Sequence, residues 1–427
     1  MPSSRPASAR DASADGSPGG RDQWAFLLEL GAPAFGMSFA LTALTTYLPT
    51  LLAASSGPLV TGLVVGGEGL AGIVVPVLVG LLNDRWAGTV GDRLRLVLLV
   101  APVAVVGLLL AALDVAPAVI IVGAAVYFVG HFAYLTPYEA LYPDLVPDAV
   151  SGRSRTAASA WRFAGLGGAL IGGGFLLDLW EPAVFLVTAL AVVVGTAVLA
   201  SAVRPYRHHR LPRSPPGGGG LRPMLALVRE PGVAVVLVAT LLWNLALQGL
   251  KAFVVLFFVV GLGRSASFVS GVVFPLVALG LVAVLPWAGR VADRVGHRPV
   301  LAAASAVYGA GLVGAGLSHS AWMIALTPVA AGAAGIVMTL NYSALMRALP
   351  GEHHGAASGL FLVSRGAGSL AGPLLVGVAV SVAGPLFPAT NGYDAMWFVI
   401  GPAVLLAVPL LLVRRRSDEE GSEEPDR

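Results

Sequence analysis

The chain has no cysteine in its 427 residues, a single lysine, and little charge of either sign. Without cysteine there are no disulfides, no thiolate-bound metals and no thiol nucleophile. Charged residues make up 11% of the chain and hydrophobic residues 56%, and the mean hydropathy is +0.83. Roughly 25% of the residues of a typical soluble domain are charged. The composition therefore predicts a protein whose surface faces lipid.

Long apolar runs recur along nearly the whole chain. Twelve of them are long enough to cross a bilayer: 24–53, 57–82, 94–113, 117–141, 156–178, 182–203, 231–261, 267–289, 299–318, 321–346, 356–382 and 393–413. Lipid offers no partner to a free backbone group, and the alternating pattern of barrel strands is absent, so each run is predicted to be a helix. The predicted fold class is an all-α membrane protein with twelve transmembrane helices.

The polar segments divide these helices into two sets of six. We predict a disordered tail over 1–23, a six-helix bundle over 24–203, an Arg/Pro/Gly-rich linker over 204–230, a second bundle over 231–413 and a tail over 414–427. Arginines cluster in the linker, in the last tail and in every second connection, whereas the other connections contain only Arg264. By the positive-inside rule, both termini and the linker are predicted to be cytoplasmic, in a cell (plasma or inner) membrane.

The two halves also repeat each other in sequence. Residues 80–85 match 289–294, residues 138–141 match 342–345, and Arg162 matches Arg365, always in the same order. A repeat of this kind predicts two pseudo-symmetric bundles with a substrate site between them near the middle of the membrane.

The segment 289–298 resembles the loop signature of the major facilitator superfamily, Gly-x-x-x-Asp-Arg-x-Gly-x-Arg. In the first half the second glycine of the signature comes late, at Gly91, and this spacing resembles the glycoside-pentoside-hexuronide symporters and the sucrose transporters. Pro76 and the segment 137–145 resemble the same branch. The resemblance implies the major facilitator fold and a sugar or glycoside carried together with a cation.

Three positions depart from that branch. Val75 and Ala71 stand where the sodium-coupled members have acids, and Phe128 aligns with the acid of the sucrose transporters. Glu68 is the remaining acid near the middle of a predicted helix, where an ionisable group is costly and therefore a functional candidate. We interpret Glu68 as the proton carrier; the alternative is a glutamate hydrogen-bonded permanently between helices.

Polar side chains at helical spacing mark candidate substrate contacts. Asn244, Gln248 and Lys251 form one stripe, and Ser38, Thr42 and Thr45 form the matching stripe in the first helix. The hydroxyl groups have an alternative, which is bonding to their own helix. Further candidates are Tyr127, His131, Asn341 and Tyr342, for which the alternative is ordinary packing.

Charged residues near the cytoplasmic helix ends are candidates for gating. Glu139 and Arg162 are placed to pair with each other. Within the loop signature, a carboxylate can accept a hydrogen bond from a neighbouring helix or arginine and latch the halves in one state, unless these are ordinary loop charges. The signature residues concerned are Asp84, Arg85, Asp293 and Arg294.

The sequence thus predicts a secondary active transporter that moves a sugar or glycoside by alternating access with proton coupling. A drug/proton antiporter of the same fold is the first alternative, although 165–168 lacks the Gly-Pro pair typical of that branch. A non-transporting receptor is the second. No clustered nucleophile, metal ligands or large aqueous domain indicates an enzyme. The expected partners are a small-molecule substrate, protons and the lipid bilayer; we expect a monomer, and no cofactor, metal or nucleic acid.

Overall fold

The computed structural model describes residues 20–113, 115–147, 150–211, 228, 230–319, 321–347 and 354–412. Twelve helices in this part of the chain are long and apolar enough to cross a membrane, which confirms the number predicted from the hydrophobic runs. The tails predicted over 1–23 and 414–427 lie outside the described residues, except that the first helix already begins at Gly20.

The helices follow the chain in two sets. The first set is α1 (Gly20–Trp86), α2 (Val90–Ala112), α3 (Pro117–Leu145), α4 (Ser151–Leu179) and α5 (Ala183–Val203), followed by a short 3₁₀ turn, η3 (Arg204–Tyr206). The second set is α7 (Pro231–Leu256), η4 (Phe257–Gly261), α8 (Ala266–Phe268), η5 (Val269–Val273), α9 (Phe274–Val295), α10 (His297–Leu317), α11 (Ala321–Arg347), α12 (His354–Ala383), η7 (Pro388–Thr390) and α13 (Ala395–Leu412).

Helix α1 contains two membrane spans, Gln23–Ala53 and Ser55–Asn83. They meet at Gly57, which has φ 77° and ψ 169°, outside the helical region. Glycine adopts such a positive φ at little cost, and Pro58 after it cannot continue the hydrogen-bond ladder. The chain therefore reverses direction here without a separate loop, and the first set supplies six spans, as the second does.

Each set packs as a bundle around apolar side chains. In the first, α1 packs against α3, α4 and α5, and α2 packs against α3; in the second, α7 packs against α12 and α13, and α10 against α11 and α13. Large side chains such as Tyr47, Tyr127, Phe185, Trp243 and Phe257 are fully buried in these interiors. Two pseudo-symmetric six-helix bundles result, as predicted.

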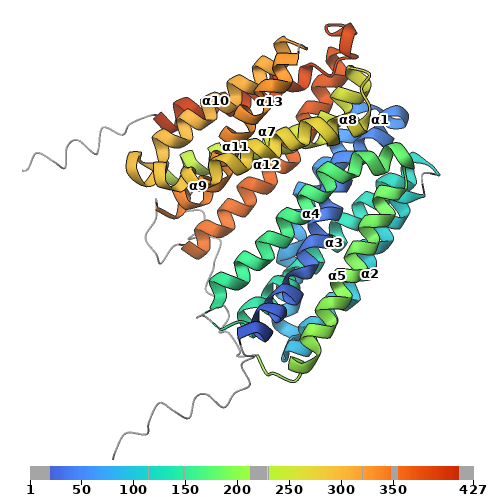
Figure 1. The fold of residues 1–427 in the computed structure, drawn as a ribbon, viewed down its shortest axis with the longest axis vertical. Coiled ribbons are helices and arrows are strands. Elements are labelled where there is room, and N and C mark those ends of the chain that lie inside the picture. Colours follow the sequence, from blue (N-terminus) through green and yellow to red (C-terminus); the bar gives the residue numbers. More distant parts are fainter. Residues whose placement is uncertain are drawn as a thin grey trace, which may run out of the picture.

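The bundles touch through small residues. Gly62, Gly66 and Gly69 of α1 lie directly against backbone carbonyls of α12, so closely that a Cβ atom on any of them would collide with Pro373, Leu370 or Gly366. Small residues allow such close approach between membrane helices. On the other side of the molecule, α4 packs against α8 and η5 (Figure 1).

The two ends of the molecule differ. We call the end with η3 and the starts of α4 and α12 the linker end, and the end with Gly57 and α8 the far end. At the linker end the strand-like segment after η3 pairs with the connection between α1 and α2: Val90 N–H donates to His209 O at 3.0 Å, and Leu211 N–H to Gly88 O at 3.0 Å. This pairing fixes the start of the predicted linker to the first bundle.

Candidate functional site

Glu68 and Gln248 meet in the interior, between the two bundles. Glu68 lies in the second span of α1 and Gln248 in α7, and each is only 8% exposed. The Gln248 side-chain amide donates to both oxygens of the Glu68 carboxylate, at 3.2 and 3.1 Å. A buried carboxylate needs such donors, because burial without them is costly. This contact brings together two residues that the sequence marked separately, one for coupling and one for substrate.

Lys251 is one helical turn beyond Gln248 on the same face of α7. Its side chain is partly exposed, and the charges of Glu68 and Arg365 act on its ammonium group. Among the described residues, no carboxylate is close enough to form a salt bridge with Lys251. The lysine therefore has no salt bridge among the described residues, and the carboxylate whose charge acts on it, Glu68, already accepts hydrogen bonds from Gln248.

Tyr127 and His131 of α3 are joined to each other. The Tyr127 hydroxyl lies 3.0 Å from His131 Nδ1 and donates to Met37 O at 3.4 Å. Both side chains are buried, at 0% and 3% exposed. The charge of Glu68 acts on Tyr127 and that of Lys251 on His131, so this pair lies near the Glu68–Gln248 contact, and substrate contact by the pair stays a prediction.

Two side chains of the predicted stripe in the first helix are hydrogen-bonded within the first bundle. Ser38 Oγ donates to Arg162 O of α4 at 2.9 Å, whereas Thr45 Oγ1 bonds to its own helix at Leu41 O, 2.8 Å away. Thr42 is buried, at 3% exposed. Asn244 behaves like Thr45, since its amide donates to Thr240 O at 2.9 Å. Substrate contact by these four side chains stays a prediction.

The two candidates of α11 face different surroundings. Asn341 is 1% exposed and accepts from Thr240 Oγ1 of α7 at 2.7 Å. Tyr342 is 44% exposed, and its hydroxyl lies 2.9 Å from Ser358 Oγ of α12. In this conformation Asn341 joins helices of the second bundle, and Tyr342 is the more accessible of the two.

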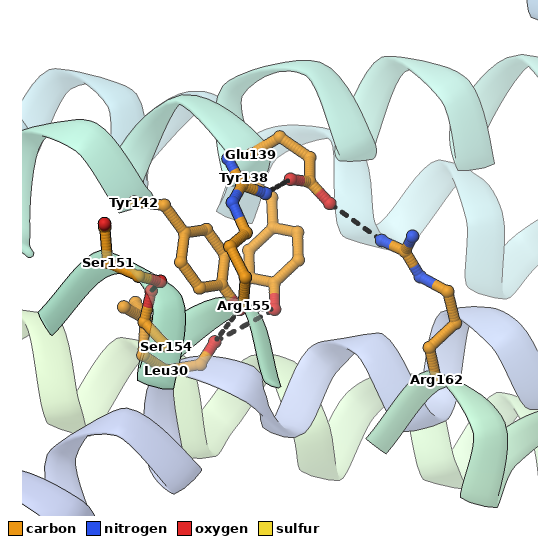
Figure 2. Close-up of polar contacts among 8 residues, drawn as sticks. All are labelled: Leu30, Tyr138, Glu139, Tyr142, Ser151, Ser154, Arg155 and Arg162. Carbon is orange, nitrogen blue, oxygen red and sulfur yellow. Dashed lines mark hydrogen bonds and ion pairs between the residues drawn. The ribbon is translucent and has the colours of Figure 1, made fainter. Parts of the chain in front are cut away.

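Glu139 of α3 binds two arginines of α4 (Figure 2). Its two carboxylate oxygens lie 2.6 Å from Arg155 Nη1 and 2.9 Å from Arg162 Nη2. The Arg155 guanidinium also lies 5.0 Å above the ring of Tyr142. The predicted Glu139–Arg162 pair is present, and Arg155 is a partner that the sequence did not indicate. All these groups belong to the first bundle.

The loop signature is partly described. Asp293 pairs with Arg347 of α11 at 2.9 Å, and both side chains are more than 60% exposed, at 62% and 63%. Arg85 and Arg294 are exposed, and the Asp84 side chain lies outside the described residues. In this conformation the Asp293 pair stays within the second bundle, and the latch between bundles stays a prediction.

A buried ion pair in the first bundle was not predicted. Arg93 at the start of α2 contacts Asp144 at the end of α3, at 2.7 Å, with side chains 15% and 10% exposed. Arg93 also donates to Ala140 O at 2.6 Å. Both residues stand in the two motifs that resemble the symporter branch, so the signal was present, but it did not show that they pair.

Hydrogen bonds at the far end join the bundles, and the sequence did not indicate them. Ser270 Oγ of η5 lies 2.8 Å from the Tyr47 hydroxyl and accepts from Gly174 N–H at 3.0 Å. Ser267 N–H donates to Asp178 at 2.8 Å. A hollow of about 500 Å³ lies beside these contacts, lined by polar groups including Asp178 and Ser265. Serine and tyrosine are unremarkable in a membrane helix, so no sequence signal singled them out.

A metal site is not formed by the described residues, among which no three His, Asp or Glu side chains come close enough to share an ion. The polar groups between the bundles are instead a carboxylate, amides, hydroxyls, an imidazole and cations. Such groups suit the reversible binding of a polar solute or a proton.

Comparison with known proteins supports the architecture. The family model described as Major Facilitator Superfamily matches residues 270–427, and no curated protein sequence matches the chain. Among solved structures, the chain is similar to the nucleoside transporter NupG, with a TM-score of 0.73 and 14% identity over 91% of this chain and 100% of that one.

Two further structures are similar to the same degree. A bacterial homologue of the human lysosomal transporter Spinster, in an inward-facing and occupied conformation, gives a TM-score of 0.74 with 14% identity over 93% of this chain and 97% of that one. The POT family transporter PepTSo gives 0.73 with 14% identity over 94% and 99%. At these identities the similarity establishes the fold, which is the twelve-helix major facilitator fold.

Proposed function

We propose that this protein is a secondary active transporter of the major facilitator superfamily that carries a small polar solute with a proton. The fold, the family match over the second half and the three transporters of similar structure support transport rather than catalysis. By the positive-inside rule, the linker end faces the cytoplasm, with the protein in a cell membrane. The protein acts as a monomer in this proposal.

The observation that carries this proposal is the contact between Glu68 and Gln248. It joins the two bundles through a carboxylate at the middle of the molecule. When the bundles rock, this contact has to break or change, because its two members move with different bundles. A proton on Glu68 removes the negative charge that Gln248 and Lys251 stabilise, so protonation and rocking are linked.

The contacts at the two ends of the molecule indicate which conformation of the transport cycle this structure represents. The far end is closed by the hydrogen bonds of Ser270 and Ser267, whereas the ion pairs described near the linker end lie within single bundles. We interpret this conformation as open toward the cytoplasm. A solute would reach Glu68 and Gln248 from the linker end.

A sugar or glycoside is the first class of solute to test. An amide and an aromatic hydroxyl lie at or near the Glu68 carboxylate, on Gln248 and Tyr127, and such groups bind polyhydroxylated solutes. The similar structures carry nucleosides or belong to the POT family, by their names, so the fold admits several classes.

The test is accumulation of solute in liposomes under an imposed pH gradient. Glu68→Gln keeps the shape of the side chain and cannot release a proton, so we expect ligand binding and exchange to persist while accumulation against a gradient is lost. Glu29→Gln is the matched control, because Glu29 is an exposed glutamate earlier in α1. Sodium should make little difference, since Val75 and Ala71 cannot coordinate it.

Two results would contradict this assignment. One is a wild-type protein that needs sodium, and the other is a Glu68→Gln variant that still concentrates solute when only a pH gradient drives it. The proton would then have to be carried elsewhere, and His131, which contacts Tyr127 and lies near Lys251, is the next residue to change.

A further inference from the structure

The described ionisable groups between the Glu68–Gln248 contact and the linker end have an excess of positive charge. Arg162 and Arg365 stand at the same depth in two helices related by the repeat, each eleven residues after the first residue of α4 or α12. Both side chains are exposed, although they lie inside membrane-spanning segments. An arginine in a bilayer is costly unless it faces water or a partner, so we place both on the path from the linker end.

Only one of these two arginines has a carboxylate partner among the described residues. Arg162 pairs with Glu139, which also holds Arg155, so two cations share one carboxylate. Arg365 has none within salt-bridge distance in the same part of the chain, and its charge acts on Lys251. Each bundle therefore has one more arginine than carboxylates along this path from the linker end to Lys251.

Lys251 is a further basic group without a salt-bridge partner among the described residues. The negative charge that acts on it is that of Glu68, and this carboxylate already accepts two hydrogen bonds from Gln248. If Glu68 takes up a proton, as the proposed function requires, Lys251 loses its only counter-charge in the described interior. An anion beside Lys251 would then replace the lost carboxylate charge and again favour the ammonium form of the lysine.

We propose that the transported solute carries an anionic group, a carboxylate or a phosphate ester, which replaces the Glu68 carboxylate as the counter-ion of Lys251. Arg162 and Arg365 attract this anion along the path from the linker end. The inference rests on the proposed function and narrows its substrate class. It also disfavours a cationic drug as the solute, because these cations would repel it.

The single lysine makes a direct test available. Pyridoxal 5′-phosphate and 5-deoxypyridoxal are nearly matched aldehydes, because neither can close to an internal hemiacetal, and only the first carries a phosphate. Each condenses with an uncharged amine with loss of water, and borohydride then reduces the imine to a stable secondary amine. Mass spectrometry of the peptide around Lys251 separates its modification from that of the chain's amino terminus. The purified protein is labelled in liposomes of zwitterionic lipid.

We expect pyridoxal 5′-phosphate to modify Lys251 at least tenfold faster than 5-deoxypyridoxal does. Arg365→Gln should reduce this preference severalfold, whereas Arg347→Gln, which removes the same charge from an exposed pair with Asp293, should leave it unchanged. Soluble anions such as inorganic phosphate or glucuronate should protect Lys251, and glucose at the same concentration should not.

Several results would overturn the inference. They are equal rates for the two aldehydes, no modification of Lys251 by either, protection by glucose as strong as by glucuronate, or protection only when phosphatidylglycerol is added, which would indicate a lipid headgroup. Labelling does not require transport. A protein that shows the phosphate preference but accumulates no solute would refute the proposed function and leave the anion site standing.

Discussion

The far end and the linker end of the molecule hold their helices in different ways. At the far end, Tyr47, Gly174 and Ser270 join the two bundles through short buried contacts. Near the linker end, the described ion pairs of Glu139 and Asp293 join helices of the same bundle. Buried hydrogen bonds between bundles resist separation, whereas exposed pairs within a bundle leave it free to move. This difference supports the proposed state of the transporter, in which the linker end is open and these buried contacts hold the far end shut.

The far-end closure should be most sensitive to Gly174. A Cβ atom there would collide with Ser270 Oγ and with the backbone of Ala266. Overpacking costs about 1–3 kcal/mol, and about 1.4 kcal/mol shifts a two-state equilibrium tenfold. We therefore expect Gly174→Val to raise the population of far-end-open molecules roughly tenfold.

Distances between spin labels can measure that shift, because the chain contains no native cysteine. Labels at Leu179→Cys and Leu386→Cys, both exposed, report on the far end of each bundle. Gly172→Val is the control, since a Cβ at Gly172 meets nothing within 4 Å. An unchanged distance distribution in Gly174→Val, or an equal change in both variants, would refute the role of this contact.

Ser270→Ala should act in the same direction with a smaller effect. It removes the hydrogen bonds to Tyr47 and Gly174, and a net hydrogen bond contributes about 0.5–1.5 kcal/mol. Tyr47 keeps a second acceptor, Leu170 O at 2.9 Å, which limits the loss. We expect a severalfold shift in the same label distances, and none in Ser201→Ala, an exposed serine that bonds to its own helix.

A double-mutant cycle decides whether the Tyr47–Ser270 contact itself is responsible. If it is, Tyr47→Phe should add little to Ser270→Ala, because both remove one shared interaction. Fully additive shifts would mean that each side chain acts through other neighbours, and the far-end comparison would then rest on Gly174 alone.

The sequence predicted the fold well, because lipid restricts what apolar runs can form. Twelve runs became twelve spans, and the repeat placed them in two bundles. The polar residues were harder to assign. Glu68 and Gln248 each stood out as costly in a bilayer, but their contact depends on how two bundles meet, and hydrophobic pattern does not encode that.

Other contacts gave a misleading signal or none. Arg93 was interpreted as a marker of topology, since arginine near a helix end satisfies the positive-inside rule whether or not it pairs with Asp144. Ser270 and Tyr47 carry no cost that would single them out in a membrane helix. The residues that close the far end could therefore be found only from the structure.

At the linker end, Asp293→Asn tests whether the exposed pair with Arg347 has a role beyond its own bundle. An exposed pair contributes about 0.2–1 kcal/mol, so stability should hardly change. A latch formed in the opposite state would instead alter the balance of states, and we expect transport to slow while solute affinity stays within a few-fold. Uptake in liposomes measures the transport rate, and spin labels at Gly152→Cys and Val295→Cys measure the balance of states.

Arg347→Gln separates the pair from the latch, because it breaks the same pair but keeps the carboxylate. An Asp293→Asn variant that binds no solute, or that transports at the wild-type rate, would contradict the latch.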